Sequence, residues 1–534
     1  MPTLAKPKNI SAIVFACVAL MLGGAQSVFA HDNDDTPEWH RLNLDDDHDG
    51  DWRFNMERPF DELRSELLKR FGIFKNEFGW ARSYSTLGRI DTSPNNPFFK
   101  NFGNGRTCGS CHVQGEGFSI TPEGVRKRFA KTRGRDPIFL PNDGSNSPLL
   151  PIRTLDQKSA AFSLLLNKGL IRIGKPIPTV TNDVVPKPAE FVLDKVVDPY
   201  GFASASELSL FRRPLPATNL RFLGAVMWDS RETIKDLSAT PDPTLCINVP
   251  PPTPKPCFKP FPLALKFQAN DATLGHAQAA RDLTDAEQQA IVDFELTLVT
   301  AQEFDKSAKF LFTDGATGGG KALTEVDFYF DINSVFGDPK TGLPSSVTKL
   351  TAMHMFTPWL TDPGVRSPTI AAARESIARG EKIFNTRTFT MVGVGGTRTP
   401  TVTGATCTNC HSAPNVGSLA QPNLFNIGVG DPAWSSTPDL PLYTLRNVNP
   451  ASANFGKTVT VQDPGLAMIT GKYGDIGKFK VPNLRGLAMR APYFHDGSAK
   501  TIEETTVFYM RRFQFDVPLN GQDFADLNAF LKSL

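Results

Sequence analysis

The chain has 534 residues, 21% of them charged, and a formal net charge of +2 at pH 7. This length predicts two or three folded units rather than one, and the balanced charge argues against a nucleic-acid partner or a strongly basic membrane-binding surface. The 43 prolines and 42 glycines predict long loops over a helical skeleton, and 40 phenylalanines against seven tyrosines predict much dry apolar surface.

Residues 1–30 have the pattern of a secretory signal peptide. Lys6 and Lys8 make the start positive, residues 13–22 form an apolar stretch, and Ala30 places a small residue at the cleavage point. The alternative is an uncleaved anchor helix, but the apolar run is short for a membrane span and no stop-transfer charge follows it. We therefore predict cleavage after Ala30 and no membrane insertion afterwards.

An acidic segment follows over residues 31–51. Asp45, Asp47, Asp49 and Gly50 match the first half of an EF-hand calcium loop, in which oxygen ligands alternate and a glycine permits the turn. The closing glutamate comes one place later than that loop requires. The segment is therefore either a calcium site or a solvated acidic tail.

Apolar periodicity predicts the next elements in chain order. Helices are predicted over residues 59–78, 219–228, 282–302, 376–384 and 522–534. A short strand is predicted over residues 170–173, and loops over residues 315–320 and 337–346. The proline-rich stretch from 134 to 215 is expected to be largely irregular.

Two Cys-x-x-Cys-His motifs stand far apart in the chain. This is the attachment signature of c-type haem, because two thiols at this spacing can add to the two vinyl groups of one porphyrin and the histidine then lies under the iron. A zinc site would instead need all four cysteines to converge on one tetrahedral centre. Two complete motifs predict two covalently bound haem c groups. The attachment residues are Cys108, Cys111 and His112 in the first motif and Cys407, Cys410 and His411 in the second.

The two motifs and the predicted helices together define an expected architecture. We predict a mainly α fold of two cytochrome c-like haem domains with long irregular loops. The N-terminal haem domain, with insertions, would run over residues 31–365 and the C-terminal one over residues 366–534.

Two further cysteines, Cys246 and Cys257, remain once Cys17 in the leader and the haem cysteines are set aside. They bracket a short proline-rich loop. Because a signal peptide implies an oxidising compartment, we predict a structural disulfide between them.

Three further segments carry a resemblance to a known family. Residues 481–487 read Val-Pro-Asn-Leu-Arg-Gly-Leu, residues 491–497 read Ala-Pro-Tyr-Phe-His-Asp-Gly, and residues 227–231 read Met-Trp-Asp-Ser-Arg. Together with the two haem motifs, these segments are similar to the signature of bacterial dihaem cytochrome c peroxidases and their MauG relatives. Their order spans most of the chain from 108 to 510.

The resemblance implies a function. It implies a periplasmic peroxidase that reduces hydrogen peroxide at the N-terminal haem with electrons relayed through the C-terminal haem. The donor would be a small cytochrome c, a cupredoxin or a protein substrate. Trp228 corresponds to the family tryptophan that relays electrons between the haems, and the alternative is an ordinary core tryptophan. The rival functions are a dihaem oxygenase resembling the rubber-cleaving enzymes and a non-enzymatic dihaem electron carrier.

Several departures from the family pattern concern the first haem. No histidine occurs between His112 and His276, so the family's blocking imidazole has no counterpart there, and we expect no need for reductive activation. The family glutamine after the tryptophan is replaced by Ser238, and the nearest substitute lies around His276 and Gln278. We predict that His276 is the distal acid–base group, with Gln278 beside it. The alternative is a structural histidine at a helix start.

The sixth ligand of the second haem separates the branches of the family. The peroxidases have a methionine fourteen residues after the histidine of the Pro-Tyr-Phe-His segment, whereas the MauG type has a tyrosine there. Counting from His495 gives Tyr509, and a slip of one residue gives Met510. Phenolate favours ferric and higher oxidation states, so the resemblance implies a MauG-like high-valent state shared by both haems. His495 itself is expected beside the haem rather than on the iron.

The resemblance also implies a calcium ion between the haems. Its backbone ligands would come from Arg490 and Pro492. The asparagine side chain that the family contributes is not evident in residues 212–214, Arg-Arg-Pro, which leaves calcium binding open.

Overall fold

The computed structural model describes most of the chain after residue 70. The described residues are 71–183, 185–233, 261–329, 332–333, 352–394, 401–435 and 437–534. The predicted leader, the acidic segment, Ser238 and the predicted Cys246–Cys257 disulfide all lie outside these ranges. Residues 67–534 form one unit by their contacts. The predicted domain boundary near residue 365 falls inside this unit and stays a prediction.

The fold mixes helices with several small sheets, so the prediction of a mainly α protein is wrong. Helix accounts for 32% of the structure and strand for 18%. The physical reason is that several apolar segments pair as strands with partners far away in the sequence. Periodicity within one segment carries no information about such a partner.

The largest sheet has four strands in the order β1-β2-β6-β7. The strands are β1 (Ile73–Asn76), β2 (Gly79–Ser85), β6 (Leu298–Asp305) and β7 (Lys309–Phe310). Strand β2 pairs antiparallel with β6 across more than two hundred residues. Trp80 on β2 stacks on Phe304 of β6, with ring centroids 3.8 Å apart. The sheet corrects two predictions, because β1 lies within the predicted helix 59–78 and β6 replaces the end of the predicted helix 282–302.

Smaller sheets join distant parts of the chain. They are β12-β11-β4 (Thr458–Val461, Leu442–Asn447, Phe191–Val197), β14-β8-β9 (Gln514–Phe515, Phe389–Met391, Val402–Ala405), β3-β5 (Ile171–Lys175, Leu208–Arg212) and β10-β13 (Leu424–Phe425, Phe479–Lys480). The strand predicted over residues 170–173 is confirmed as β3. Because β4 pairs with β11, the two predicted halves of the chain share one sheet.

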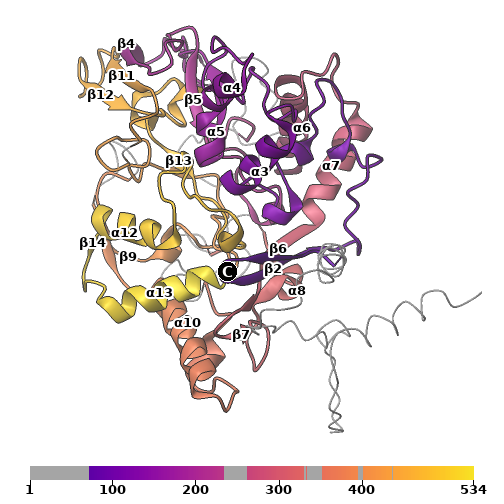
Figure 1. Ribbon diagram of the computed structural model, residues 1–534. Helices are drawn as coiled ribbons and strands as arrows, with labels where there is room; N and C mark the ends of the chain where they lie inside the picture. Colours follow the sequence, from indigo (N-terminus) through magenta and orange to yellow (C-terminus); the bar gives the residue numbers. More distant parts are fainter. Residues whose placement is uncertain are drawn as a thin grey trace, which may run out of the picture. The chain divides into compact units, whose positions relative to one another are not determined.

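The helices fall into two groups in Figure 1. Helices α3 to α7 lie toward the upper right and α10, α12 and α13 toward the lower left. Their bounds are α3 Pro122–Thr132, α4 Leu155–Ala161, α5 Ser163–Lys168, α6 Phe261–Gly275, α7 Asp285–Thr297, α8 Gly319–Thr324, α10 Pro368–Thr386, α11 Ala467–Thr470, α12 Ile502–Arg512 and α13 Gly521–Lys532. Short 3-10 helices are η2 Pro97–Phe99, η3 Cys108–Ser110, η4 Gln114–Glu116, η5 Leu220–Phe222, η7 Thr357–Leu360, η8 Cys407–Asn409, η9 Tyr473–Asp475 and η10 Leu487–Met489.

Helix predictions succeed where one apolar face packs on a neighbour. The helices predicted over 376–384 and 522–534 are confirmed as α10 and α13, which pack on each other. The helix predicted over 219–228 is wrong, because only η5 forms there. The backbone of Gly224 lies so close to that of Gln421 that an added Cβ would be 2.6 Å from it, and Met227 has φ of +66°. This close approach and left-handed turn end the helical path. The loop predicted over 315–320 also ends early, where α8 begins.

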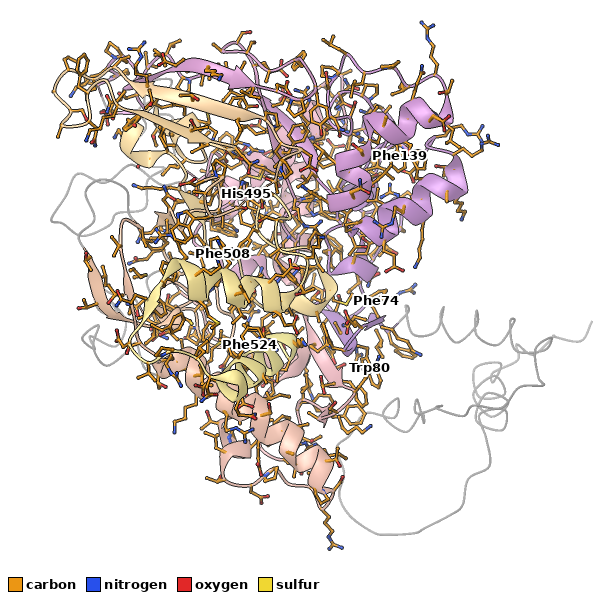
Figure 2. The ribbon with its side chains drawn as sticks, turned by 60° about the vertical axis from the view of Figure 1, so that its left-hand side comes forward. Phe74, Trp80, Phe139, His495, Phe508 and Phe524 are labelled. Atoms are coloured by element: carbon orange, nitrogen blue, oxygen red, sulfur yellow. The ribbon has the colours of Figure 1, made fainter. Side chains whose placement is uncertain are left out.

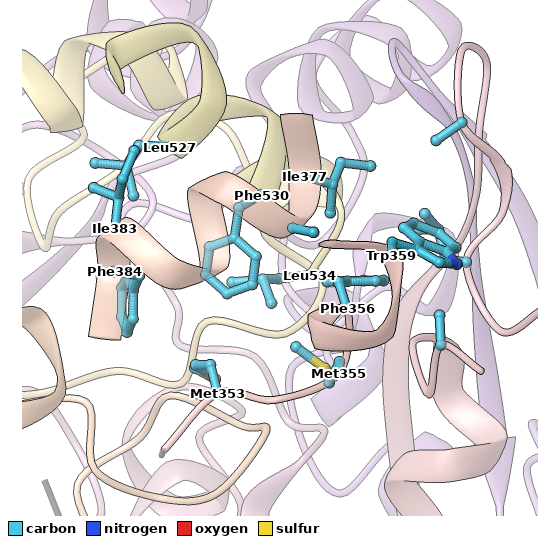
Figure 3. Close-up of a cluster of buried hydrophobic side chains, with 14 of the residues drawn as sticks. Met353, Met355, Phe356, Trp359, Ile377, Ile383, Phe384, Leu527, Phe530 and Leu534 are labelled. Carbon is cyan, nitrogen blue, oxygen red and sulfur yellow. The ribbon is translucent and has the colours of Figure 1, made fainter. Parts of the chain in front are cut away.

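The C-terminal core lies between α10 and α13 (Figure 3). Gly380 permits the crossing, because a Cβ there would be 2.0 Å from the carbonyl oxygen of Asp526. Phe384 and Phe530 are buried in this core, and the Phe384 ring also lies 6.0 Å from that of His411. The core therefore fixes one wall around the second Cys-x-x-Cys-His motif.

Helix α12 lies beside α13 and borders the interior of the unit. Figure 2 shows Phe508 on α12, Phe524 on α13 and His495 in the interior. His495 is only 1% exposed. The segment between η10 and α12, which carries His495, thus lies inside the protein rather than on a surface loop.

Candidate functional site

The two Cys-x-x-Cys-His motifs fold in the same way. Each begins with a threonine in extended conformation, followed by a single turn of 3-10 helix, η3 or η8. In η3 the Thr107 N–H donates to Ser110 Oγ at 3.0 Å, and in η8 the Thr406 N–H donates to Asn409 Oδ1 at 2.9 Å. These side chains satisfy backbone donors that a short helix would leave open. The third residue after each threonine therefore holds the motif in shape.

The two motif histidines are oriented by backbone carbonyls. His112 Nδ1 lies 3.0 Å from the Phe118 carbonyl oxygen, and His411 Nδ1 lies 2.5 Å from that of Gly417. A hydrogen bond from Nδ1–H leaves Nε2 as the free, unprotonated nitrogen, which is the form that binds a metal. Burial lowers the pKa of both His112 and His411 to about 4, so both rings are neutral at pH 7.

The four motif thiols are unpaired and lie in apolar surroundings. None forms a disulfide. Burial raises the pKa of Cys108, Cys407 and Cys410 to about 12 and that of Cys111 to about 11. Each motif therefore presents two neutral thiols and one neutral imidazole. This donor set fits covalent haem c and does not require a zinc ion.

Each motif lines its own cavity. In the N-terminal cavity, which holds Cys108, Cys111 and His112, about 170 Å³ is open to the centre of a water-sized sphere. The C-terminal cavity, with Cys407, Cys410 and His411, has about 210 Å³ of such space. Both are lined mainly by apolar side chains, which suits the faces of a porphyrin.

The two cavities share one wall. The residues that line both cavities are Arg213, Pro214, Leu215, Pro216, Trp228 and Lys480. The Trp228 indole N–H donates to the Arg213 carbonyl oxygen at 2.8 Å, and the Trp228 carbonyl oxygen accepts from the Lys480 N–H at 2.9 Å. Hydrogen bonds thus hold both the indole ring and the backbone of Trp228 between the cavities. The role of Trp228 as an electron relay stays a prediction.

His276 lies in the N-terminal cavity and is held by a carboxylate. Its Nδ1 is 2.5 Å from Asp143 Oδ2, and Arg106 pairs with the other carboxylate oxygen of Asp143. Burial acts to raise the pKa of Asp143, but His276 and Arg106 outweigh it and hold that pKa below its usual value. Gln278, in contrast, is exposed, does not line the cavity, and accepts a hydrogen bond from Asn104 at 3.0 Å. The structure therefore separates the two predicted residues.

Tyr509, on α12, lies in different surroundings from its neighbour Met510. It lines the C-terminal cavity with His411, whereas Met510 does not and packs instead against the core between α10 and α13. Successive residues of a helix point about 100° apart, so the two side chains leave α12 in different directions. Burial raises the pKa of Tyr509 above its usual value. Its phenol is therefore neutral in the absence of a nearby cation.

His495 lines the C-terminal cavity beside Trp228. Its ring stacks on Phe479 at a centroid distance of 4.2 Å and meets the Trp228 ring edge-on at 6.2 Å. His495 Nε2 lies 3.8 Å from an oxygen of Asp463, and its buried Nδ1 has no hydrogen-bond partner. Burial lowers the pKa of His495. The ring therefore packs against Trp228 in the shared wall.

A buried ion-pair cluster holds this wall and was not predicted. Arg212 Nη1 lies 2.5 Å from Asp229 Oδ2, and Arg212 Nε lies 2.7 Å from Asp463 Oδ2. Burial acts to raise the pKa of Asp229, but Arg212 and Arg231 hold it far below its usual range. The sequence carried one signal, since Asp229 directly follows Trp228, but the pairing of Arg212 with Asp463 joins segments 251 residues apart.

Glu295 is a second residue that the sequence analysis missed. It lies on α7, lines the N-terminal cavity, and is 5% exposed. One carboxylate oxygen, Oε2, is buried without a hydrogen-bond partner. Burial raises the pKa of Glu295 to about 8, so the carboxyl is mostly protonated at neutral pH. Its spacing of four from Ile291 already placed an acid on the core face of the predicted helix.

Three known proteins are similar to part of this chain. Cytochrome c551 peroxidase of Nitrosomonas europaea is 32% identical over 131 residues, which cover 24% of this chain and 31% of that protein. Cytochrome c peroxidase Ccp of Escherichia coli is 41% identical over 81 residues, covering 15% and 17%. A cytochrome-c peroxidase of Pseudomonas sp. strain SCT is 29% identical over 146 residues, covering 24% and 36%. Part of this chain is therefore similar in sequence to bacterial cytochrome c peroxidases. The matched segments span 17% to 36% of the length of these peroxidases.

One solved structure aligns with a larger part of this chain. A solved structure of a MauG-like protein associated with microbial copper homeostasis aligns over 62% of this chain and 77% of that one, at 16% identity. Its TM-score of 0.26 does not establish a common fold. No protein-family model matches this chain. Within the described ranges, no helix is long and apolar enough to cross a membrane, and no three His, Cys, Asp or Glu side chains are placed to hold a metal ion.

We predict that Glu295 makes the haem-loaded protein less stable as the pH rises. An unfolded glutamate has a pKa of about 4.3, whereas the folded value is about 8. Because the folded state keeps a proton that the unfolded state releases, the stabilising contribution is complete below about pH 4.3 and is lost as pH rises toward 8. The free energy of unfolding of Glu295→Gln minus that of wild type should therefore increase by roughly 2–5 kcal/mol from pH 4.5 to pH 8.5.

Urea denaturation of wild type and variant at both pH values measures this difference. Exposed Glu325, changed to Gln, is the matched control and should show no comparable gain. A wild type and a Glu295→Gln variant that differ by the same amount at both pH values would contradict the prediction.

Proposed function

We propose that this chain is a dihaem c-type peroxidase that reduces hydrogen peroxide with electrons from an external donor. The overall reaction converts one H₂O₂, two electrons and two protons to two water molecules. The observation that carries the proposal is the pair of cavities, each with a complete Cys-Cys-His donor set, which share the wall around Trp228. The similarity to bacterial cytochrome c peroxidases supports it.

Each cavity would hold one haem c. Cys108 and Cys111, or Cys407 and Cys410, would attach the porphyrin, and the free Nε2 of the following histidine would bind the iron. The bound haem would supply the redox centre for peroxide and for electron transfer. The apolar lining excludes water around the porphyrin faces.

We assign peroxide reduction to the N-terminal cavity because His276 lies there. Cleavage of the O–O bond requires a proton to move from one peroxide oxygen to the other. Asp143 holds Nδ1 of His276, so the ring is oriented and Nε2 remains to accept and return a proton. Arg106 pairs with Asp143 and keeps this carboxylate ionised. The Arg106–Asp143–His276 arrangement supports acid–base work more than a purely structural histidine.

We assign electron relay to the shared wall. The Trp228 indole lines both cavities, and its N–H is bonded to a backbone carbonyl rather than to a carboxylate. An oxidisable ring in this place shortens the path that an electron must cross between the two cofactors. The buried Asp229, one residue later in the chain, holds the segment through Arg212.

We infer that the Tyr509 phenolate would bind the iron of a haem in the C-terminal cavity, in addition to His411. It faces the cavity and Met510 faces away. A phenolate ligand stabilises the ferric state, which places the protein nearer to the MauG branch and permits oxidising equivalents to be shared between the cavities. The external donor would be a small cytochrome c, a cupredoxin or a protein substrate, and the compartment the periplasm.

The reaction and the role of His276 are tested together. The haem-loaded protein should consume peroxide and oxidise a reduced cytochrome c. Changing His276 to Ala should slow the reaction with peroxide on the order of 10²-fold with haem content unchanged, because proton transfer loses its carrier. Stopped-flow absorbance measures the rate.

The exposed His354, changed to Ala, is the control and should react like wild type. A wild-type protein inert to peroxide would overturn the proposed function. A reactive wild type with an equally reactive His276→Ala variant would leave the function standing and remove His276 from it.

The Tyr509 assignment predicts a paired result. Tyr509→Phe should remove one ligand from the C-terminal haem, convert it to a high-spin spectrum and raise its reduction potential, because an anionic donor is lost. Met510→Leu preserves volume and should change neither property. Spectroelectrochemical titration of both variants measures the spectrum and the reduction potential of the C-terminal haem. If Met510→Leu alters the spectrum and Tyr509→Phe does not, the ligand is Met510.

A further inference from the structure

Arg213 lies at the junction of the two cavities. It directly follows β5, lines both cavities and is only 4% exposed. Its backbone N–H donates to the His495 carbonyl oxygen at 2.6 Å, and its own carbonyl oxygen accepts from the Trp228 indole at 2.8 Å. One residue therefore links the segments that carry the relay tryptophan and the buried histidine.

The Arg213 guanidinium is surrounded by backbone carbonyls. Its Nη1 donates to the Lys168 carbonyl oxygen at 2.6 Å, and its Nη2 donates to those of Ile120 at 2.6 Å and Arg490 at 3.1 Å. Among the described residues no carboxylate forms an ion pair with it, in contrast to neighbouring Arg212. Backbone carbonyl oxygens are also ligands of calcium ions in proteins. The guanidinium therefore occupies surroundings that resemble those of a bound metal ion.

The charge of this group persists at neutral pH. Burial lowers the pKa of Arg213 to about 10, and the guanidinium therefore remains protonated at pH 7. A buried charge without a carboxylate partner is costly unless dipoles or anions stabilise it. The three carbonyl dipoles supply this stabilisation from protein groups alone.

The residues do not fit a calcium ion at this place. The resemblance to the peroxidase family implied calcium with the Arg490 carbonyl as a ligand, yet here that oxygen accepts a hydrogen bond from Arg213. Calcium takes six to eight oxygen ligands, and a guanidinium at the same carbonyl would repel it. The Arg-Arg-Pro segment, which lacks the asparagine, thus supplies a cation in its place.

We propose that the Arg213 guanidinium is a built-in cation that joins the walls of the two cavities, so that this protein needs no calcium between them. Three carbonyls bind it, and it moves with the chain rather than exchanging with solvent. Calcium binding, the Tm and the haem potentials can all be measured without peroxide turnover.

The test uses the full-length, haem-loaded protein with Asp45, Asp47 and Asp49 changed to Asn. This background removes the acidic segment as a second calcium site. Isothermal titration with Ca²⁺ should detect no binding, and EGTA should shift neither the Tm nor the reduction potential of either haem. Stoichiometric binding of Ca²⁺ together with a lower Tm in EGTA would overturn the proposal.

In the same background, Arg213→Asn should create a calcium dependence. Without Ca²⁺ its Tm should fall on the order of 5 °C, because three carbonyls lose their donor, and both haem potentials should fall with the loss of a buried positive charge. Added Ca²⁺ should restore part of each. A variant with the Tm and both potentials of its parent would overturn the proposal.

Arg126→Asn is a control for the loss of a surface arginine, and Arg213→Lys is an alternative that keeps the positive charge. Arg126 also donates to a carbonyl, that of Leu166 at 3.0 Å, but it is exposed and lines neither cavity. Arg126→Asn should therefore leave both potentials unchanged. If Arg213→Asn does not fold, Arg213→Lys keeps the charge and should retain both potentials with a smaller loss of Tm. An Arg213→Lys protein that folds only with Ca²⁺ would overturn the proposal.

Discussion

The shared wall between the cavities depends on one buried guanidinium, that of Arg212, held between Asp229 and Asp463. The three residues of this cluster lie on three segments: Arg212 on β5, Asp229 directly after Trp228, and Asp463 after β12. Removing one partner of such a buried pair leaves an uncompensated charge and costs about 3–5 kcal/mol. This pairing fixes Trp228 on one side and leaves Arg213, the next residue, free to bind carbonyls on the other. Two consecutive arginines at the end of β5 therefore have different roles at this wall: Arg212 pairs with carboxylates and Arg213 binds backbone carbonyls.

The sequence predicted those parts of the fold that are specified locally. Helices α10 and α13 followed from a 3.6-residue period, because each buries one face against the other. The prediction failed where the partner lies far along the chain. Residues 298–305 continue the apolar pattern of α7, yet they form β6 because β2 offers an antiparallel edge more than two hundred residues away. A single-segment period cannot distinguish these two outcomes, and the mainly α prediction failed for that reason.

The candidate site shows the same division. The haem motifs were predictable because Cys-x-x-Cys-His geometry is set within five residues, and their capping residues repeat in both copies. Tyr509 lines the C-terminal cavity and Met510 does not, and the choice between them as an iron ligand stays a prediction. Asp143 was not predictable as the partner of His276, since 133 residues separate them. The carbonyl ring around Arg213 left no sequence signal at all, because backbone oxygens belong to every residue.

We propose that the wall at Trp228 connects the two cavities for electron transfer. The most direct test is a single-turnover measurement in which the haem-loaded protein, reduced at the C-terminal haem, meets peroxide. Oxidation of that haem should be slowed at least on the order of tenfold in Trp228→Phe, which corresponds to a barrier higher by about 1.4 kcal/mol. The initial reaction with peroxide should keep its rate. Equal rates of C-terminal haem oxidation in wild type and variant would show that Trp228 does not carry the electrons.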